Sequence, residues 1–117
     1  EALAASAFPA PWVIKPAAEG SSIGVSIVQN EEEIDAAARE AFRYGDRVIL
    51  EKYVPGREIQ IGVLADRSIG AVEVCPSKSF YDYECKYTAG KTRYVLPPEL
   101  DPSLLESVEA AALRAHR

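Results

Sequence analysis

The sequence predicts an α+β fold, an antiparallel sheet with helices packed on one face. Most of the segments with strand character follow one another along the chain and are joined by tight turns, which favours antiparallel pairing. Two further segments carry apolar residues at helical spacing, one ending near residue 45 and one at the C-terminal end. No internal repeat or low-complexity linker interrupts this order.

The first half of the chain predicts a hairpin followed by a helix. Residues 12–16 are an apolar run that ends at a proline, and residues 25–28 alternate with a period near two, so both are expected to be strands. Small and polar residues at 17–24 form the loop between them. Asn30 is expected to cap the next helix, with three glutamates in its first turn, and Gly45 to end it.

The second half predicts three strands, a long loop and a final helix. Residues 48–54 and 58–65 are strands joined through a Pro-Gly turn, and residues 69–74 are the partner strand after a turn at 66–68. Asp101 is expected to cap the last helix, because the proline that follows it suits the first helical position.

Composition excludes several classes of function. The net charge is −5 and the acidic and basic residues are interspersed, whereas a nucleic-acid binder usually carries a basic stripe. No apolar run approaches the roughly 20 residues that a membrane-spanning helix needs. Cys75 and Cys85 match no zinc pattern, so we expect two free thiols in a reducing cytoplasm. His116 has no second ligand in view, and a metal role for it is not expected.

Lys15 lies at the end of the first predicted strand, six residues before the pair Ser21-Ser22. An ammonium group held there can neutralise phosphate oxygens as a compact charge. The segment 19–24 could cradle phosphates through backbone N–H groups and hydroxyls, although it is neither a Walker A loop nor G-x-G-x-x-G. The residues alone leave a plainer interpretation open, a solvent-facing lysine before an ordinary hairpin tip.

The predicted strand at 48–54 contains Glu51 and Lys52 near its end, and Glu58 follows Glu51 by seven residues. A strand end exposes backbone N–H and C=O groups without ladder partners, which adenine can use, and a nearby carboxylate can bind two ribose hydroxyls. A solvated glutamate–lysine pair, which contributes little to stability, is the alternative that the residues leave open.

Residues 78–87, KSFYDYECKY, hold four aromatic side chains, two lysines and two carboxylates in the predicted long loop. Aromatic side chains exclude water over a large area, and Tyr also offers a hydroxyl. Loops longer than about 12 residues are usually functional or disordered, and this one is too aromatic for ordinary disorder. We predict a lid over a polar reaction. A partner-binding patch and a loop packed on its own domain are the alternatives.

Taken together and in this order, the segments resemble the D-alanine–D-alanine ligases of the ATP-grasp superfamily. The matching stretches are VIKPAAEGSSIGVS, VILEKYVPGREI, FYDYECKY and YVLPPEL. The resemblance runs from about Trp12 to the end of the chain. The first two are shared loosely with other ATP-grasp enzymes, whereas the aromatic stretch is far more specific. The resemblance implies an ATP-grasp-type antiparallel sheet, truncated in this chain.

The resemblance also implies the reaction and its catalytic residues. These enzymes phosphorylate the carboxylate of one D-alanine and let the amine of a second attack the acyl phosphate, making a peptidoglycan precursor. Ser21 and Tyr87 would belong to a hydrogen-bonded set over the first D-alanine. Lys15 would contact the α- and β-phosphates of ATP, with Lys86 as a second phosphate ligand. A closing lid would keep water from the intermediate.

Five further positions would hold the rest of the nucleotide. Glu51 and Lys52 would meet the adenine, and Val54 would offer its backbone N–H. Glu58 would hold the ribose, and Phe80 would pack on the purine. The partners implied are ATP and D-alanine, with no nucleic acid and no membrane. A cytoplasmic location is expected, and the intact enzyme is expected to be a homodimer.

Two positions depart from the family pattern, and one expected component is absent. Cys85 stands where the family often has alanine, and Gln60 stands where threonine is common, a position that we expect to lie outside the chemistry. The resemblance implies Mg²⁺, but its acidic and asparagine ligands are expected beyond residue 117. No metal ligand is therefore predicted within the chain.

The expected domain organisation is that of the central part of a longer enzyme. Residues 1–11 would be the remnant of an N-terminal linker and residues 12–117 a partial ATP-grasp domain. Within it, residues 12–54 would form a glycine-loop subdomain. Residues 55–117 would begin the C-terminal subdomain, with the aromatic lid loop at 77–91. Two alternatives stand beside D-alanine–D-alanine ligation: an ATP-grasp ligase with another second substrate, such as D-serine, and a non-catalytic nucleotide-binding module.

We predict that residues 1–117 expressed by themselves do not ligate D-alanine, because the implied metal ligands are not among them. The measurement is D-alanine-dependent phosphate release from ATP. Release above the rate seen without D-alanine would contradict the prediction.

Overall fold

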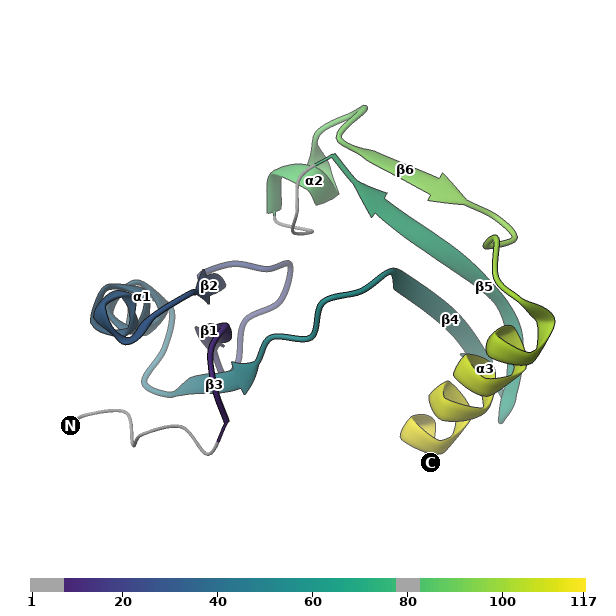
Figure 1. Cartoon of the computed structure of the whole chain (residues 1–117), viewed down its shortest axis with the longest axis horizontal. Coiled ribbons are helices and arrows are strands. Elements are labelled where there is room, and N and C mark those ends of the chain that lie inside the picture. Colours follow the sequence, from purple (N-terminus) through teal and green to yellow (C-terminus); the bar gives the residue numbers. More distant parts are fainter. Residues whose placement is uncertain (1–7, 78–82) are drawn as a thin grey trace. The chain divides into compact units, whose positions relative to one another are not determined.

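The computed structural model describes residues 8–77 and 83–117, which fall into two compact units. The first unit contains the described residues up to Pro55 together with residues 83–87, and the second contains residues 56–77 and 88–117. Each unit has its own three-stranded antiparallel sheet and at least one helix (Figure 1). The predicted α+β class is confirmed, with two small sheets in place of the single sheet expected from the sequence.

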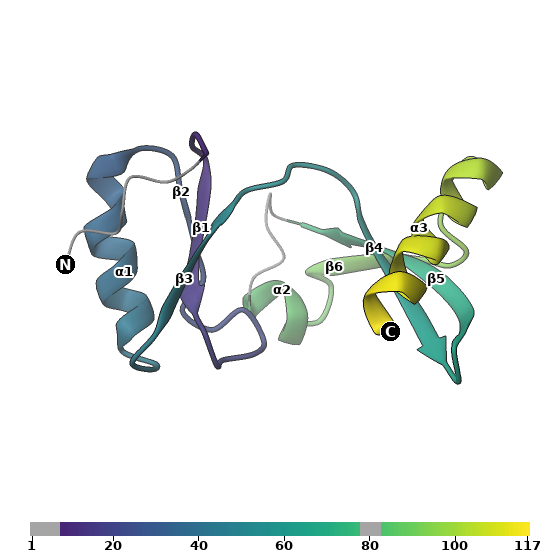
Figure 2. The same cartoon turned by 90° about the horizontal axis from the view of Figure 1, so that it is seen from below.

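The sheet of the first unit has β1 (Trp12–Pro16) at its centre, flanked by β2 (Ser26–Val28) and β3 (Val48–Lys52). Both neighbours are antiparallel to β1, with Trp12 opposite Val28 on one side and Lys52 on the other. The predicted hairpin is therefore confirmed. The helix α1 (Ile34–Phe42) covers one face of this sheet, as the two views show (Figures 1 and 2).

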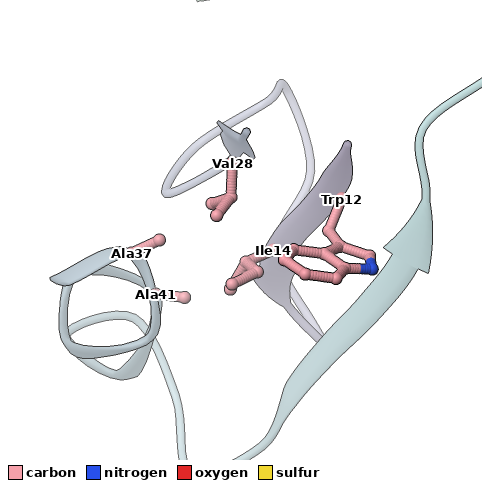
Figure 3. Close-up of a cluster of buried hydrophobic side chains, with 5 residues drawn as sticks. All are labelled: Trp12, Ile14, Val28, Ala37 and Ala41. Carbon is pink, nitrogen blue, oxygen red and sulfur yellow. The ribbon is translucent and has the colours of Figure 1, made fainter. Parts of the chain in front are cut away.

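The core of the first unit lies between this sheet and α1. Side chains of the strands point toward two alanines of the helix (Figure 3), and the buried cluster consists of Trp12, Ile14, Val28, Ala37 and Ala41. Small helix residues let the backbone of α1 approach the strands, so that Ile14 and Ala41 are completely buried. The indole N–H of Trp12 donates to the carbonyl of Phe8 at 3.0 Å, which satisfies its polar atom.

The start of the first helix differs from the prediction. Glu31–Glu33 form a 3₁₀ turn before α1, and the side chain of Asn30 caps neither. Glu33 reaches back instead, accepting from the backbone N–H of Gln29 at 2.8 Å and from the Asn30 amide at 3.1 Å. The glutamate thus satisfies an N–H at the helix start, as it does in a capping box.

The second unit is built on β5 (Arg67–Pro76), which pairs with β4 (Glu58–Leu64) and β6 (Thr92–Val95). The turn between β4 and β5 is Ala65-Asp66, shorter than the predicted turn at 66–68, and both residues have positive φ. Two left-handed residues match the twist of a two-residue hairpin. The strand β6 was not predicted, because its four residues lie inside the segment expected to be a loop.

The helix α3 (Pro102–His116) lies against β4 and β5 in the second unit (Figure 1). Its predicted cap is confirmed: the carboxylate of Asp101 accepts from the backbone N–H of Ser103 at 3.0 Å and from its hydroxyl at 2.8 Å. These bonds lower the pKa of Asp101. Ser68 of β5 donates to Glu109 at 2.8 Å and ties the helix to the hairpin. None of the helices that the structure describes has the length and apolar character needed to cross a membrane.

An arginine–glutamate pair ties the start of β4 to β5 in the second sheet. Arg57 donates to the carboxylate of Glu73 through Nε at 2.7 Å and through a terminal nitrogen at 2.5 Å, and also to the carbonyl of Glu99 at 3.0 Å. Glu73 is nearly buried in the middle strand, so a bidentate partner compensates its carboxylate. We call these three residues the Arg57 clamp. Hydrogen bonding from Arg57 lowers the pKa of Glu73.

The clamp predicts a pH-dependent contribution to stability. Because the folded pKa of Glu73 lies below the ordinary glutamate value of 4.5, its contribution is present above that pH and is lost as the pH falls through the folded pKa. The free energy of unfolding of wild type minus that of Glu73→Gln should therefore be largest above about pH 4.5 and shrink at lower pH. Urea titrations followed by circular dichroism measure it. Glu106→Gln, at an exposed position of α3, is the control, and a difference for Glu73→Gln that stays constant with pH contradicts the prediction.

Candidate functional site

The face of the first sheet away from α1 carries a lysine and a glutamate in contact. Along β1 the buried residues alternate with less buried ones, so Ile14 faces the helix and Lys15 faces the other way. Lys15 lies opposite Ile49 of β3, and Glu51 is the diagonal neighbour on the same face. The Lys15 Nζ–Glu51 Oε2 distance is 2.8 Å.

Lys15 can exchange Glu51 for a ligand at little cost in free energy. The side chains of Lys15 and Glu51 are 34 % and 47 % exposed, and an ion pair open to water contributes about 0–1 kcal/mol. An incoming anion could therefore take the ammonium from the carboxylate. The arrangement can hold a phosphate group at Lys15, the contact expected for this lysine, beside the strand where Glu51 is expected to meet the adenine.

The loop after β1 contains two consecutive serines in the left-handed region, Ser21 with φ 55° and Ser22 with φ 59°. Residues other than glycine rarely adopt this conformation, which costs about 1–2 kcal/mol each. Within the loop, the N–H of Ile23 donates to the carbonyl of Gly20 at 3.1 Å, which holds the serine turn closed.

Ser21 contacts the aromatic segment directly. Its Oγ lies 2.6 Å from the hydroxyl of Tyr87, the last residue of α2 (Tyr83–Tyr87). The two residues are 66 positions apart in the sequence. In both views α2 lies on the side of the first sheet away from α1 (Figures 1 and 2). The alternation along β1 and the register with β3 place Lys15 and Glu51 on that same face. The loop and the aromatic segment therefore meet over the polar face of the sheet.

The short helix α2 was expected to be part of a loop. Tyr83 and Tyr87 are four residues apart on one face, with ring centroids 4.6 Å apart, and both are largely exposed. Between them Cys85 is buried, and neither Cys75 nor Cys85 is in a disulfide. Lys86 precedes Tyr87 and is partly buried.

The remaining predicted positions are distributed over the edge of β3 and the second unit. Lys52 ends β3, and Val54 follows it with its side chain 78 % exposed. Glu58 is the first residue of β4, in the second unit, and its Oε1 accepts from the side-chain amide of Gln60 at 3.2 Å. Phe80 lies outside the described residues.

Two features of the site were missed from the sequence. Gln60, which we expected to lie outside the chemistry, contacts the predicted ribose ligand Glu58. Gly24, at the end of the serine loop with φ 67°, packs so closely that an added Cβ would lie 2.8 Å from Cδ2 of Tyr44 and 2.9 Å from Cγ of Pro16. The alternation of β4 could have placed Gln60 beside Glu58, whereas no sequence signal links Gly24 to Tyr44.

The resemblance implies Mg²⁺ with ligands expected beyond residue 117, and the described residues form no metal-binding cluster of their own. Within residues 8–77 and 83–117, no three histidine, cysteine, aspartate or glutamate side chains lie close enough to hold a metal ion. We therefore derive no chemical step through a metal from these residues.

Comparison with known proteins places this geometry in a family. Residues 2–117 match the family model described as the C-terminus of D-Ala–D-Ala ligase. The D-alanine–D-alanine ligase of Geobacter sulfurreducens is 50 % identical over 113 residues, 97 % of this chain and 36 % of that protein. That of Geotalea uraniireducens is 45 % identical over 116 residues, 99 % of this chain and 37 % of that protein. The chain thus spans a little over a third of the length of these curated relatives.

Two solved structures have the same fold. The VanG D-Ala:D-Ser ligase of Enterococcus faecalis superposes with a TM-score of 0.76 at 33 % identity, over 92 % of this chain and 32 % of that one. The D-alanine–D-alanine ligase of Bacillus anthracis gives 0.72 at 31 % identity, over 90 % of this chain and 34 % of that one. The resemblance inferred from the sequence is thereby confirmed.

We predict that Gly24→Ala destabilises the first unit by roughly 1–3 kcal/mol, because it combines a left-handed backbone with two close contacts. Urea unfolding followed by the fluorescence of Trp12, the only tryptophan, measures the loss. Gly20→Ala is the matched control in the same loop, since its added Cβ would have no neighbour within 4 Å. Equal stability of the two variants contradicts the prediction.

Proposed function

The chain belongs to the D-alanine–D-alanine ligase family, and on this premise we propose that the protein joins two D-alanines, using ATP, for peptidoglycan precursor synthesis. The single observation that carries this proposal is the 2.6 Å contact between Ser21 and Tyr87. It connects the glycine-containing loop after β1 with the aromatic segment, two parts that a lid over a reactive intermediate has to bring together.

Lys15 is the proposed ligand of the α- and β-phosphates. Lys15 lies two residues before the loop that follows β1, and its ammonium group contacts Glu51 on the face of the sheet away from α1. It can exchange that partner for a phosphate oxygen. Lys86, next to Tyr87 on α2, is the proposed second phosphate ligand. Two lysines suit phosphoryl transfer, in which charge neutralisation and positioning matter more than covalent participation.

The serine loop and α2 are proposed to protect the acyl phosphate. A carboxylate oxygen of the first D-alanine attacks the γ-phosphorus of ATP and displaces ADP, which gives the acyl phosphate. The amine of the second D-alanine then attacks the acyl carbon, loses a proton and displaces phosphate. Water would attack the same carbon. Ser21 and Tyr87 would form a hydrogen-bonded cover over the first D-alanine, and the aromatic rings beside them would exclude water.

The edge of β3 is proposed to bind the base of the nucleotide. Glu51 and Lys52 would meet the adenine, the backbone N–H of Val54 would pair with a ring nitrogen, and Phe80 would cover the purine. Glu58 would accept from the ribose hydroxyls. Mg²⁺ stays a prediction of the family resemblance, and no group of described side chains supports it.

A related second substrate is the alternative that a specific observation favours. The D-Ala:D-Ser ligase VanG has a TM-score of 0.76 to this chain, so its fold fits as well as that of a D-alanine–D-alanine ligase. Under either reaction we propose a cytoplasmic homodimer. Two cysteines without a disulfide suit the reducing compartment in which ATP is available.

The test of the function is a product analysis with the complete gene product. Incubated with ATP, D-alanine and D-serine, it should form D-alanyl-D-alanine, identified by mass spectrometry. A mixed D-alanyl-D-serine product would support the alternative. ATP hydrolysis without either dipeptide would contradict both.

We predict that Lys15→Gln raises the KM for ATP of the complete gene product about 10- to 100-fold, as expected for the loss of one charged contact to phosphate. Arg39→Gln removes an equally charged but exposed side chain from α1 and is the control. Steady-state kinetics with varied ATP at fixed D-alanine measure both. An unchanged KM for ATP in Lys15→Gln would show that this lysine does not bind the phosphates.

A further inference from the structure

We propose that Gln60 is a positioning residue that orients the carboxylate of Glu58 and thereby sets how strongly the site selects a ribonucleotide over a deoxyribonucleotide. The inference rests on the proposed role of Glu58 in binding the ribose. It concerns the second unit alone and adds a residue that we expected from the sequence to lie outside the chemistry.

The strand β4 places both side chains on one face. Its residues alternate in exposure, so Glu58 and Gln60 point to the open side while Ile59 between them points to the covered side. Glu58 lies opposite Val74 and Gln60 opposite Val72 on β5. The Gln60 Nε2–Glu58 Oε1 distance is 3.2 Å, within hydrogen-bonding range.

Only one orientation of the Gln60 side-chain amide is compatible with this hydrogen bond. An ionised carboxylate only accepts hydrogen bonds, so Gln60 must present its NH₂ group and not its carbonyl oxygen. The bond engages Oε1 and restricts rotation of the carboxylate plane. The remaining lone pairs on Oε1 and those on Oε2 then keep a defined direction, which suits simultaneous acceptance from the two neighbouring hydroxyls of a ribose.

The backbone beneath this pair is already fixed. Arg57 precedes Glu58, and the Arg57 clamp ties it to Glu73, which lies opposite Ile59 in the sheet. The same arginine donates to the carbonyl of Glu99. Arg57 thus ties the start of β4 to β5 and to Glu99. The conformational freedom left to Glu58 is rotation about its side-chain torsions, which the hydrogen bond from Gln60 restricts.

A carboxylate oriented in advance loses less conformational entropy when it binds two hydroxyls. A nucleotide with only one of these hydroxyls gains less from that orientation. Loss of the Gln60 amide should therefore weaken ATP more than 2′-deoxyATP. A residue that only stabilises β4 would weaken both nucleotides by the same factor.

The experiment compares the dissociation constants of ATP and 2′-deoxyATP for the complete gene product and three variants, using isothermal titration calorimetry. Gln60→Leu removes the amide while keeping a side chain of similar length that an exposed strand position tolerates. Gln29→Leu makes the same change at the other glutamine of the chain, an exposed position in the first unit. Glu58→Ala removes the proposed ribose ligand itself.

We expect the preference for ATP over 2′-deoxyATP to fall about three- to tenfold in Gln60→Leu, the range for one hydrogen bond, and to be unchanged in Gln29→Leu. Glu58→Ala should lower it at least as much. If Glu58→Ala lowers the preference and Gln60→Leu does not, the role of Gln60 is wrong while the proposed ribose site stands. If Glu58→Ala leaves the preference unchanged, the ribose role of Glu58 is wrong and the proposal falls with it.

Discussion

The alternation of side chains along β1 is the constraint on which the candidate site depends. Ile14 is completely buried against α1, and a strand places its next residue on the opposite face. Lys15 therefore has to lie on the face away from the helix, where Glu51 of the neighbouring strand meets it. A shift of β1 by one residue would bury the ammonium group and expose the core side chain, so packing of the core fixes the position of the charge.

Two segments that are distant in the sequence meet beside the sheet face that carries the Lys15–Glu51 pair. The serine loop accepts two left-handed residues, and its end is packed against Tyr44 through Gly24. Tyr44 is itself held by a hydrogen bond from its hydroxyl to Glu40 at 3.3 Å and by the guanidinium group of Arg43, 5.9 Å from its ring centre. The C-terminal end of the loop is thus packed against Tyr44, which is hydrogen-bonded to α1. Ser21, in the middle of the loop, contacts Tyr87 of α2. Strain of this kind persists only where surrounding contacts hold it, and it is common at ligand-binding turns.

Much of the fold was predictable because its signals are local. The alternation in β4, the apolar run of β1 and the cap at Asp101 each depend on neighbouring residues. The bounds of β1 and the cap were predicted correctly, and the end of β4 was predicted one residue too late. The division into two sheets was not predicted, because it depends on which strands pair across long separations in the sequence. Likewise, four residues at Thr92–Val95 become β6 only through their pairing with β5. The helix α2 has one turn, and its burial of Cys85 is a tertiary effect.

The candidate site was likewise predictable in part from the sequence. Lys15, Ser21, Glu51 and Tyr87 were predicted through the resemblance, and the structure places them in one unit as two contacting pairs. Gln60 was judged by its identity alone, without regard to its hydrogen bond with Glu58. The resemblance names residues expected to touch the ligand, whereas it says nothing of the side chains that contact those residues.

The central claim is that the face of the first sheet carrying Lys15 and Glu51, together with the serine loop and α2, binds the nucleotide. The most direct measurement is a titration of the ¹⁵N-labelled complete gene product with a non-hydrolysable ATP analogue, followed by amide chemical shifts. The account predicts the largest changes at Lys15, Ser21, Glu51 and Tyr87. Changes confined to the exposed side of α1 or to α3, with these four amides unmoved, would contradict it.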